Sequence, residues 1–308
     1  MRITDILHSG TKPFPSLEVV PPLAGSSTAD ILDTIGELME FAPRYVNVTC
    51  HRDEYEFRQA ADGSWQRVLA KSRISPVEVC REIGRKFGVE TVPHLICAGN
   101  TAAMLETLID EVRNAGIHNV MALRGDSLQG ERRFTPEPDG YSHASELVAA
   151  IRKEDGDICI GVGGYPEKHF EAANLDDDIE ALKLKVDAGA DFIITQMFFD
   201  NRRFYEFVGK CRAAGISVPI IPGIKPLSTV RHIALLPEAF SIDIPLPLTE
   251  AVREAAMDHT DPKEAVYRVG TDWAIAQVRD LLAHGVPAVH FYTMGRTRNI
   301  SEILRSSF

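Results

Sequence analysis

The sequence predicts an α/β fold, a single (β/α)8 TIM barrel, on three observations. A helical stretch, a glycine and an apolar β-rich run follow one another five times along the chain, at Gly88, Gly116, Gly189, Gly215 and Gly285. A glycine just after a helix suits the left-handed C′ position, and alternating helices and strands form a parallel sheet covered by helices. The 308 residues suffice for one such barrel, and no linker or low-complexity tract divides them.

The first strand is expected at residues 16–20, where an apolar, β-branched run is closed by prolines on both sides. Alternation places Ser16 and Glu18 on one face and Leu17 and Val19 on the other. Burying a charged carboxylate among apolar side chains is costly, so Glu18 is expected to have a raised pKa or a dedicated partner. The alternative is an edge strand with Glu18 in solvent.

The remaining elements continue the alternation. Seven further strands are expected near residues 45–49, 91–95, 119–123, 158–163, 192–196, 218–223 and 288–292. Helices are expected near residues 28–41, 75–87, 101–115, 143–153, 176–188, 201–214, 228–236 and 297–305, with two more in 247–284. An open, doubly wound sheet is the alternative fold. It would normally carry a glycine-rich fingerprint after the first strand, where this chain has two prolines.

Composition narrows the classes of function and location. The net charge of −11 argues against nucleic acid or an anionic membrane surface as the main partner. No run approaches the roughly 20 apolar residues of a membrane span, and the first residues lack the apolar core of a signal peptide. The five cysteines are dispersed without CxxC spacing, which fits reduced thiols and no zinc site. We therefore expect a cytoplasmic protein without a metal site.

In a barrel of this kind, the functional site lies at the C-terminal ends of the strands. Nearly every expected strand delivers a polar or ionisable group there, namely Glu18, Thr49, His94, Arg124 to Asp126, Tyr165, His169, Gln196, Lys225 and Arg296. Each has an ordinary alternative explanation: Thr49 as a cap, His94 as a satisfied core imidazole, Arg296 as the surface partner of Glu302. Their common position at one rim predicts a ligand site.

The residue types at this rim narrow the chemistry. No Ser/His/Asp or Cys/His pair stands out. Lys225 is the one lysine placed for a Schiff base, and a proline-flanked loop lysine is more often solvated. A large ligand with phosphates and a polar ring would suit Thr49, Arg124, Asp126, Tyr165 and Lys185. Taken residue by residue, the sequence predicts a barrel enzyme with a sizeable anionic ligand and a buried acid.

Eight motifs occur in the order seen in methylenetetrahydrofolate reductases, and the chain resembles this family from about residue 14 to 305. The motifs are Ser-Leu-Glu-Val-Val-Pro-Pro (16–22), Pro-His-Leu-Ile-Cys (93–97), Ala-Leu-Arg-Gly-Asp (122–126), Gly-Tyr-Pro-Glu-Lys-His (164–169), Lys-Val-Asp-Ala-Gly-Ala (185–190), Ile-Thr-Gln-Met-Phe-Phe-Asp (194–200), Pro-Gly-Ile-Lys-Pro (222–226) and His-Phe-Tyr-Thr (290–293).

The resemblance implies a flavin-dependent oxidoreductase of one-carbon metabolism and methionine biosynthesis. Such an enzyme reduces 5,10-methylenetetrahydrofolate to 5-methyltetrahydrofolate with NADH or NADPH, by ping-pong hydride transfer through FAD. The partner is then a small folate substrate, and a homo-oligomer is expected. Residues 1–308 would form one catalytic barrel domain that binds FAD, with no regulatory domain. The choice between NADH and NADPH stays open.

The resemblance also implies roles for individual residues. Glu18 matches the catalytic acid, and Asp126 matches a second catalytic carboxylate near the flavin pyrimidine edge that also contacts the pterin. Gln196 matches a residue that serves nicotinamide and pterin, and Arg296 one that binds folate. Cofactor contacts carry over to Thr49, on the nicotinamide side, and to His94, Arg124, Gly125, Asp126, His143, Ala144, Tyr165, His169, Ala172, Asp178 and Lys185.

The expected chemistry agrees with an acid at Glu18. Opening the imidazolidine ring of the substrate needs a proton on the leaving nitrogen, and the resulting iminium accepts hydride. Two alternatives from other classes are a protein that binds flavin and folate without turnover, and another flavin barrel oxidoreductase such as a proline dehydrogenase.

Several positions depart from the commoner pattern of the family. Ala181 and Leu184 stand where some relatives have Asn and Arg in contact with FAD. Leu236 falls where enteric relatives have a Phe that stacks on the ligand. The loop 50–74 is longer than in enteric relatives and is a candidate cover for the site.

Overall fold

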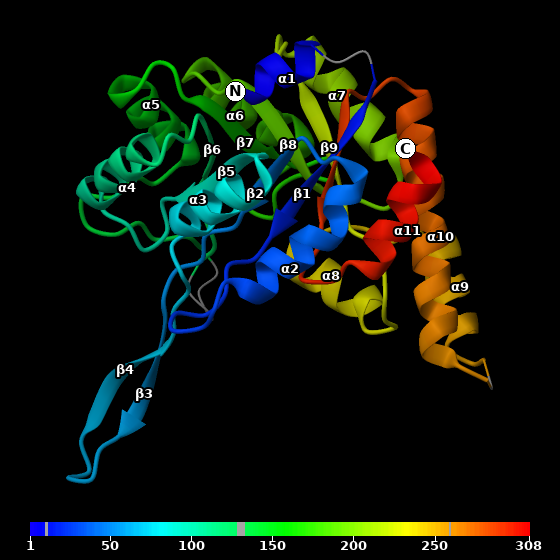
Figure 1. Cartoon of the computed structure of the whole chain (residues 1–308), viewed down its shortest axis with the longest axis horizontal. Coiled ribbons are helices and arrows are strands. Elements are labelled where there is room, and N and C mark those ends of the chain that lie inside the picture. Colours follow the sequence, from blue (N-terminus) through cyan, green and yellow to red (C-terminus); the bar gives the residue numbers. More distant parts are fainter. Residues whose placement is uncertain (10–11, 128–132, 259) are drawn as a thin grey trace.

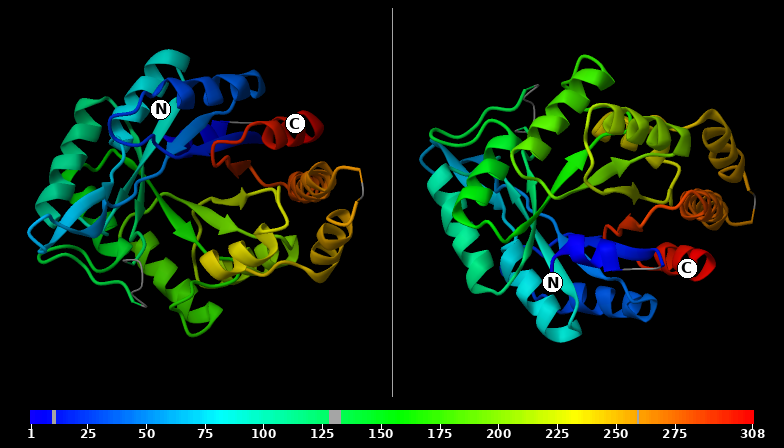
Figure 2. Two further views of the ribbon diagram at one scale, coloured as in Figure 1. Left: turned by 90° about the horizontal axis from the view of Figure 1, so that it is seen from below. Right: turned by 90° about the horizontal axis from the view of Figure 1, so that it is seen from above.

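The computed structural model describes residues 1–9, 12–127, 133–258 and 260–308. Eight parallel strands close into a barrel in the order β1-β10-β9-β8-β7-β6-β5-β2, and helices surround it (Figure 1, Figure 2). The strands are β1 (Phe14–Val19), β2 (Tyr45–Val48), β5 (Glu90–Ile96), β6 (Asn119–Leu123), β7 (Cys159–Gly164), β8 (Phe192–Met197), β9 (Ile220–Ile224) and β10 (Ala288–Tyr292). The predicted TIM barrel is confirmed, and the open-sheet alternative is wrong.

The helices follow the predicted alternation with one shift. They are α2 (Ala29–Leu38) with the short 3-10 helix η1 (Met39–Phe41), α3 (Pro76–Phe87), α4 (Ala102–Asn114), α5 (Ala144–Glu154), α6 (Leu175–Asp187), α7 (Asn201–Ala213), α8 (His232–Phe240), α9 (Leu246–Ala255), α10 (Pro262–Ala283) and α11 (Arg298–Ser307). The helix predicted at 228–236 lies four residues further on, because the chain first turns and the helix then continues through Pro237. None of the described helices combines the length and apolar character needed to cross a membrane.

The glycines that predicted helix ends adopt the expected conformation. Gly88, Gly116, Gly189, Gly215 and Gly285 all have positive φ, between 65° and 117°. At the end of α3, the Gly88 N–H closes the last turn by donating to the carbonyl of Gly84. A residue with a Cβ would be strained there, so these positions confirm the helix–glycine–strand units.

The core has two layers that follow the alternation predicted for β1. Leu17 and Val19 face outward and pack in the large cluster between strands and helices. The lower barrel is filled by a second cluster of strand residues, onto which Ile3 and Ile6 of α1 (Ile3–Ser9) pack. Helix α1, which the sequence pattern did not predict, thus closes the N-terminal end with apolar side chains.

The long segment after β2 forms an antiparallel hairpin of β3 (Glu54–Gln59) and β4 (Trp65–Lys71). It projects away from the barrel body (Figure 1). In this arrangement it does not cover the site, contrary to the expectation for the loop 50–74. Apolar and charged residues alternate along β3, which explains why this segment is extended and not an irregular loop.

Candidate active site

Glu18 lies inside the barrel near its C-terminal end. Its strand β1 pairs with β10 on one side and β2 on the other, so the edge-strand alternative is wrong. The side chain is 14% exposed, and its Oε2 lies 3.5 Å from Nε2 of His94 and 3.6 Å from Nε2 of His290. The expected dedicated partner therefore exists and consists of two imidazoles from other strands.

Both imidazoles are held by further buried polar groups. His94, on β5, lies 3.2 Å from the amide nitrogen of Asn47, and His290, on β10, lies 2.9 Å from Oγ of Ser16. Sequence analysis included His290 in a motif but assigned it no role. The sequence does not reveal the register in which β10 pairs with β1. This register places His290 opposite Ser16.

The expected rise in the pKa of Glu18 is wrong. Burial raises this pKa, but the contact with His290 and the electrostatic interactions with His94, His290 and His51 together outweigh burial and lower it. Burial also lowers the pKa of His94 to about 4, so His94 is neutral near pH 7.

Several of the residues expected to hold FAD lie together between β6, β7 and α6. Arg124 forms an ion pair with Glu171. The rings of Tyr165 and His169 meet edge to face with 4.9 Å between centroids. The backbone N–H of His169 donates to Oδ2 of Asp178 at 3.1 Å, which ties this loop to α6.

Lys185 is a half-buried cation of this group. Its Nζ donates to the carbonyl oxygen of Gly163 at 2.7 Å, and burial lowers the pKa of Lys185 to about 8. Burial likewise raises the pKa of Asp178. A half-buried ammonium close to the Arg124 guanidinium forms a donor set that fits phosphate oxygens. The residues present therefore fit a pyrophosphate-bearing cofactor such as FAD.

Other expected cofactor residues have structural roles in the fold. Gly125 has a φ of +83°, and an added Cβ would come within 2.8 Å of the Ala98 Cβ, so close chain approach requires glycine there. His143 caps α5, with its N–H donating to Glu146 at 3.2 Å, and Ala144 begins the helix. The roles expected for Ala172, whose N–H donates to the carbonyl of His169, and for exposed Asp126 remain predictions.

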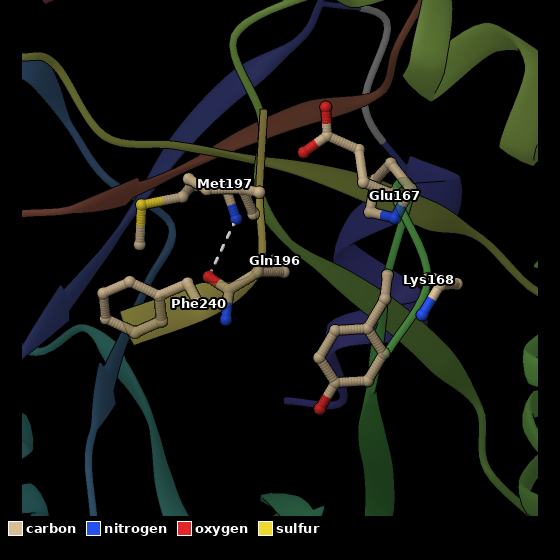
Figure 3. Close-up of a pocket in the computed structure, with 8 residues that line it drawn as sticks. Glu167, Lys168, Gln196, Met197 and Phe240 are labelled. Carbon is tan, nitrogen blue, oxygen red and sulfur yellow. Dashed lines mark hydrogen bonds between the residues drawn. The ribbon is translucent and has the colours of Figure 1, made fainter. Parts of the chain in front are cut away.

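Thr49 and Gln196 lie at the same end of the barrel. Thr49 Oγ1 lies 3.0 Å from Nε2 of His51. Gln196 accepts a hydrogen bond from the N–H of Met197 at 2.9 Å and lines a shallow recess with Tyr165 and Phe240 (Figure 3).

Phe240 is an aromatic residue of this recess that sequence analysis missed. The predicted helix ended at residue 236, before Pro237, whereas α8 continues and presents Phe240 with 38% of its surface exposed. Leu236 is 2% exposed and packs in the core with Met197. Leu236 thus lies in the core, and Phe240 is the residue of α8 that reaches the recess.

Glu167 also lines the recess and fixes the chain that follows α8. Its Oε2 accepts a hydrogen bond from the N–H of Asp243 at 2.9 Å. Burial raises the pKa of Glu167 to about 7. The Gly-Tyr-Pro-Glu-Lys-His motif contained this residue, but only the fold shows that it joins two loops of the rim.

Arg296 has a different partner from the one considered in the sequence. Its guanidinium donates to Oγ of Ser228 at 2.8 Å, whereas Glu302 pairs with Arg268 and Arg298. The surface pair between Arg296 and Glu302 is therefore wrong, and the Arg296 guanidinium lies beside the loop before α8.

Comparison with known proteins gives consistent matches. A family model described as methylenetetrahydrofolate reductase matches residues 2–307. "Methylenetetrahydrofolate reductase (NADH) 1" of Arabidopsis thaliana is 31% identical and the match covers 98% of this chain and 49% of that protein. "5,10-methylenetetrahydrofolate reductase" of Escherichia coli is 33% identical, and the match covers 91% of this chain and 86% of that protein. The chain spans about half the length of the plant relative and of the similarly matched "Methylenetetrahydrofolate reductase 1" of Schizosaccharomyces pombe.

Solved structures share the fold at low sequence identity. An uncharacterized protein from Clostridium thermocellum that binds two copies of 5-methyl-5,6,7,8-tetrahydrofolic acid matches with a TM-score of 0.63 at 12% identity, covering 99% of this chain and 97% of that one. A phosphoenolpyruvate phosphomutase from Streptomyces platensis subsp. rosaceus matches with a TM-score of 0.51 at 13% identity, covering 98% and 84%. At these identities the matches support the barrel fold alone.

Proposed function

Because this chain belongs to the methylenetetrahydrofolate reductase family, we propose that it reduces 5,10-methylenetetrahydrofolate to 5-methyltetrahydrofolate with NADH or NADPH through bound FAD. The observation that carries the proposal is the pairing of two features at one barrel end. Glu18 lies between two imidazoles inside the barrel, and Arg124 and Lys185 lie at the same rim beside a recess lined by an amide and aromatic rings.

The cofactor site would be formed mainly by β6, β7 and α6. Arg124 and Lys185 would bind the pyrophosphate, with Arg124 shared between a phosphate and Glu171. Tyr165 and His169 would lie along the cofactor, and Asp126 near its ring. When bound, FAD supplies the hydride chemistry, accepting hydride from nicotinamide and delivering it to folate.

Glu18 would supply the proton for ring opening of the substrate. Since its pKa is lowered, the carboxylate form dominates near neutral pH, and the acid form arises by proton uptake. His94 and His290 orient the carboxyl group, and Ser16 and Asn47 hold the imidazoles in turn. Gln196 and Arg296 would orient the pterin and the glutamate end of the folate.

The proposal is tested by single-turnover chemistry on the purified protein. Under anaerobic conditions, NADH or NADPH should bleach the flavin absorbance, and 5,10-methylenetetrahydrofolate should then restore it with formation of 5-methyltetrahydrofolate. A protein that binds both ligands without this exchange would be a non-catalytic binder. Reduction of the flavin by proline, with no reoxidation by 5,10-methylenetetrahydrofolate, would indicate a different flavin oxidoreductase.

Cofactor binding gives a prediction of its own. We expect the protein to purify yellow with non-covalent FAD that denaturation releases, and Lys185→Met should weaken FAD binding roughly 10- to 100-fold, as expected for loss of a charged hydrogen bond. Apoprotein titrated with FAD gives the dissociation constant. Lys183→Met is the matched control, because Lys183 lies on the same helix and pairs with Asp187 at the surface. A colourless protein that cannot be reconstituted would contradict FAD as the cofactor.

The pKa of Glu18 predicts the pH dependence of the folate half-reaction. The value kcat/KM reports the free enzyme, and a pKa lowered from 4.5 means that the protonated fraction falls about tenfold per pH unit from pH 6 to pH 8. Hence kcat/KM for 5,10-methylenetetrahydrofolate should rise steadily as the pH is lowered over this range, as measured by stopped-flow flavin reoxidation. A plateau below pH 7 would instead indicate a raised pKa.

A further inference from the structure

The hairpin of β3 and β4, which projects from the barrel body (Figure 1), has two chemically different faces. Alternate residues of a strand share a face, and residues opposite one another in an antiparallel pair lie on the same side of the sheet. Tyr55 lies opposite Leu69, Phe57 follows Tyr55 by two residues, and Trp65 precedes Leu69 by four. All four side chains therefore lie on one side, which we call the apolar face.

The apolar face is open to solvent. Its four side chains are between 48% and 68% exposed, and Phe57 and Trp65 are the most exposed aromatic residues in the part of the chain that the structure describes. The other face carries ion pairs, such as Lys71 with Glu54 at 2.5 Å, and is suited to water. Contiguous exposed apolar side chains mark interaction sites, whereas single ones need no explanation.

Both ends of the hairpin are fixed to the barrel rim. Three hydrogen bonds of 2.6 to 3.0 Å join residues 72–74 to residues 21–24, the loop that follows β1. On the other side, Arg52 pairs with Glu137 at 3.1 Å. Folding the hairpin back over the barrel mouth would have to break these contacts. The apolar face is therefore held outward, where a partner outside this barrel can reach it.

The hairpin also lacks the packing that such an element needs. Among the described strands, β3 pairs with β4 alone and β4 with β3 alone. A two-stranded hairpin by itself is at best marginally stable in water, and a third strand or a packed apolar face is needed for more. A second layer on the apolar face would supply the missing stability.

The charge of the hairpin favours a second copy of this chain as the partner. Residues 54–71 have a net charge of zero, whereas the whole chain has −11. The balancing residues are Glu54, Glu56 and Asp62 against Arg58, Arg67 and Lys71. Two copies repel each other over surfaces of like charge, and a neutral arm is where they can meet without that cost. The one charged side chain on the apolar face, Arg67, already lies over the ring of Tyr55, 3.8 Å from its centroid.

We propose that the apolar face of the hairpin packs against the same face of a second copy, around a two-fold axis. The two hairpins then form a small sandwich whose ion-paired faces remain in water. With 150–250 Å² for a fully buried aromatic side chain, the partly exposed residues of the apolar face would bury on the order of 500 Å² per copy. Both copies together reach on the order of 1,000 Å², the size at which specific interfaces begin. The proposal is independent of the proposed reaction, because the apolar face contains no residue of the candidate active site.

Sedimentation equilibrium of the full chain over a range of concentrations tests the interface. We expect the wild-type protein to sediment at twice the chain mass. Phe57→Glu should raise the dissociation constant of the dimer roughly 100-fold or more, because each dimer would bury two unpaired carboxylates in place of two aromatic rings. Gln66→Glu is the matched control: it adds the same charge at an exposed position on the ion-paired face, opposite Arg58, and should leave the dimer intact.

Hydrogen exchange of the wild-type protein, followed by mass spectrometry, locates the interface without any variant. Peptides covering residues 54–71 should be protected at concentrations where the dimer forms and should exchange faster on dilution. Trp65→Ser removes a ring from the apolar face without adding a charge, and it should also weaken the dimer if Phe57→Glu fails to fold.

Three results would overturn the interface. A dimer that Phe57→Glu and Gln66→Glu weaken equally, or not at all, would place the contact on another surface. A monomer whose hairpin amides are protected would show that the apolar face packs onto its own chain. A monomer whose hairpin amides exchange rapidly at every concentration would show that a second copy does not cover this face.

Discussion

Glu18→Gln is expected to slow reoxidation of the reduced flavin by 5,10-methylenetetrahydrofolate roughly 10²- to 10⁴-fold, the usual contribution of a positioned general acid. Glutamine keeps the size of the side chain and its polar contacts with His94 and His290 but cannot deliver a proton. Reduction of the flavin by NADH or NADPH needs no proton on folate, so its rate should stay within a small factor. Anaerobic stopped-flow absorbance measures both half-reactions separately.

The control for this variant is Glu238→Gln, an exposed position on α8, which should leave both half-reactions unchanged. Equal losses in the two half-reactions would show that Glu18 supports the site without acting as the acid. If neither half-reaction slows, another group delivers the proton, and the role that the resemblance implies for Glu18 is wrong.

Arg296→Ala is expected to raise KM for 5,10-methylenetetrahydrofolate roughly 10- to 100-fold, because a charge-assisted hydrogen bond to a carboxylate contributes about 1.5–3 kcal/mol. Flavin content should stay the same, since the expected FAD residues lie on the far side of the barrel mouth, around β6, β7 and α6. Steady-state kinetics with saturating NADH, together with flavin absorbance per protein, measures both quantities.

Arg298→Ala is a matched control two residues away. Arg298 pairs with Glu264 and Glu302 at the surface, so its loss should alter stability slightly and leave KM for folate unchanged. Similar folate kinetics for Arg296→Ala and the wild-type protein would mean that Arg296 only holds the loop at Ser228.

Local patterns predicted most of the fold because barrels of this class repeat one local unit. The glycine after each helix reports a left-handed backbone, and this conformation is a property of a few neighbouring residues. Alternation in β1 likewise separated Leu17 from Glu18 correctly. The exceptions were segments whose structure depends on distant contacts. Helix α1 is short and stabilised by packing onto the barrel floor, and the hairpin 54–71 pairs with itself and projects from the body.

The sequence could predict which residues lie at the strand ends that form the candidate site, but not the distances between their side chains. Parallel strands in a barrel bring their C-terminal ends together, so Glu18, His94, Gln196 and Arg296 could be placed at one rim before any distance was known. Phe240 could not, because a proline normally ends a helix and α8 continues through one.

The sequence by itself thus determined the fold class, the strand faces, the rim of the site and the family. Only the tertiary structure decided which polar and charged groups lie beside one another, and therefore how their pKa values shift. Oγ of Ser16 and Nδ1 of His290 belong to residues 274 positions apart in the chain and lie 2.9 Å apart in space. The charge of Arg296 adds to burial in lowering the pKa of Lys225, because β9 and β10 are neighbours. A pKa depends on through-space charges and burial, and sequence spacing contains neither. This is why the expected rise in the pKa of Glu18 became a fall once two imidazoles were placed beside it.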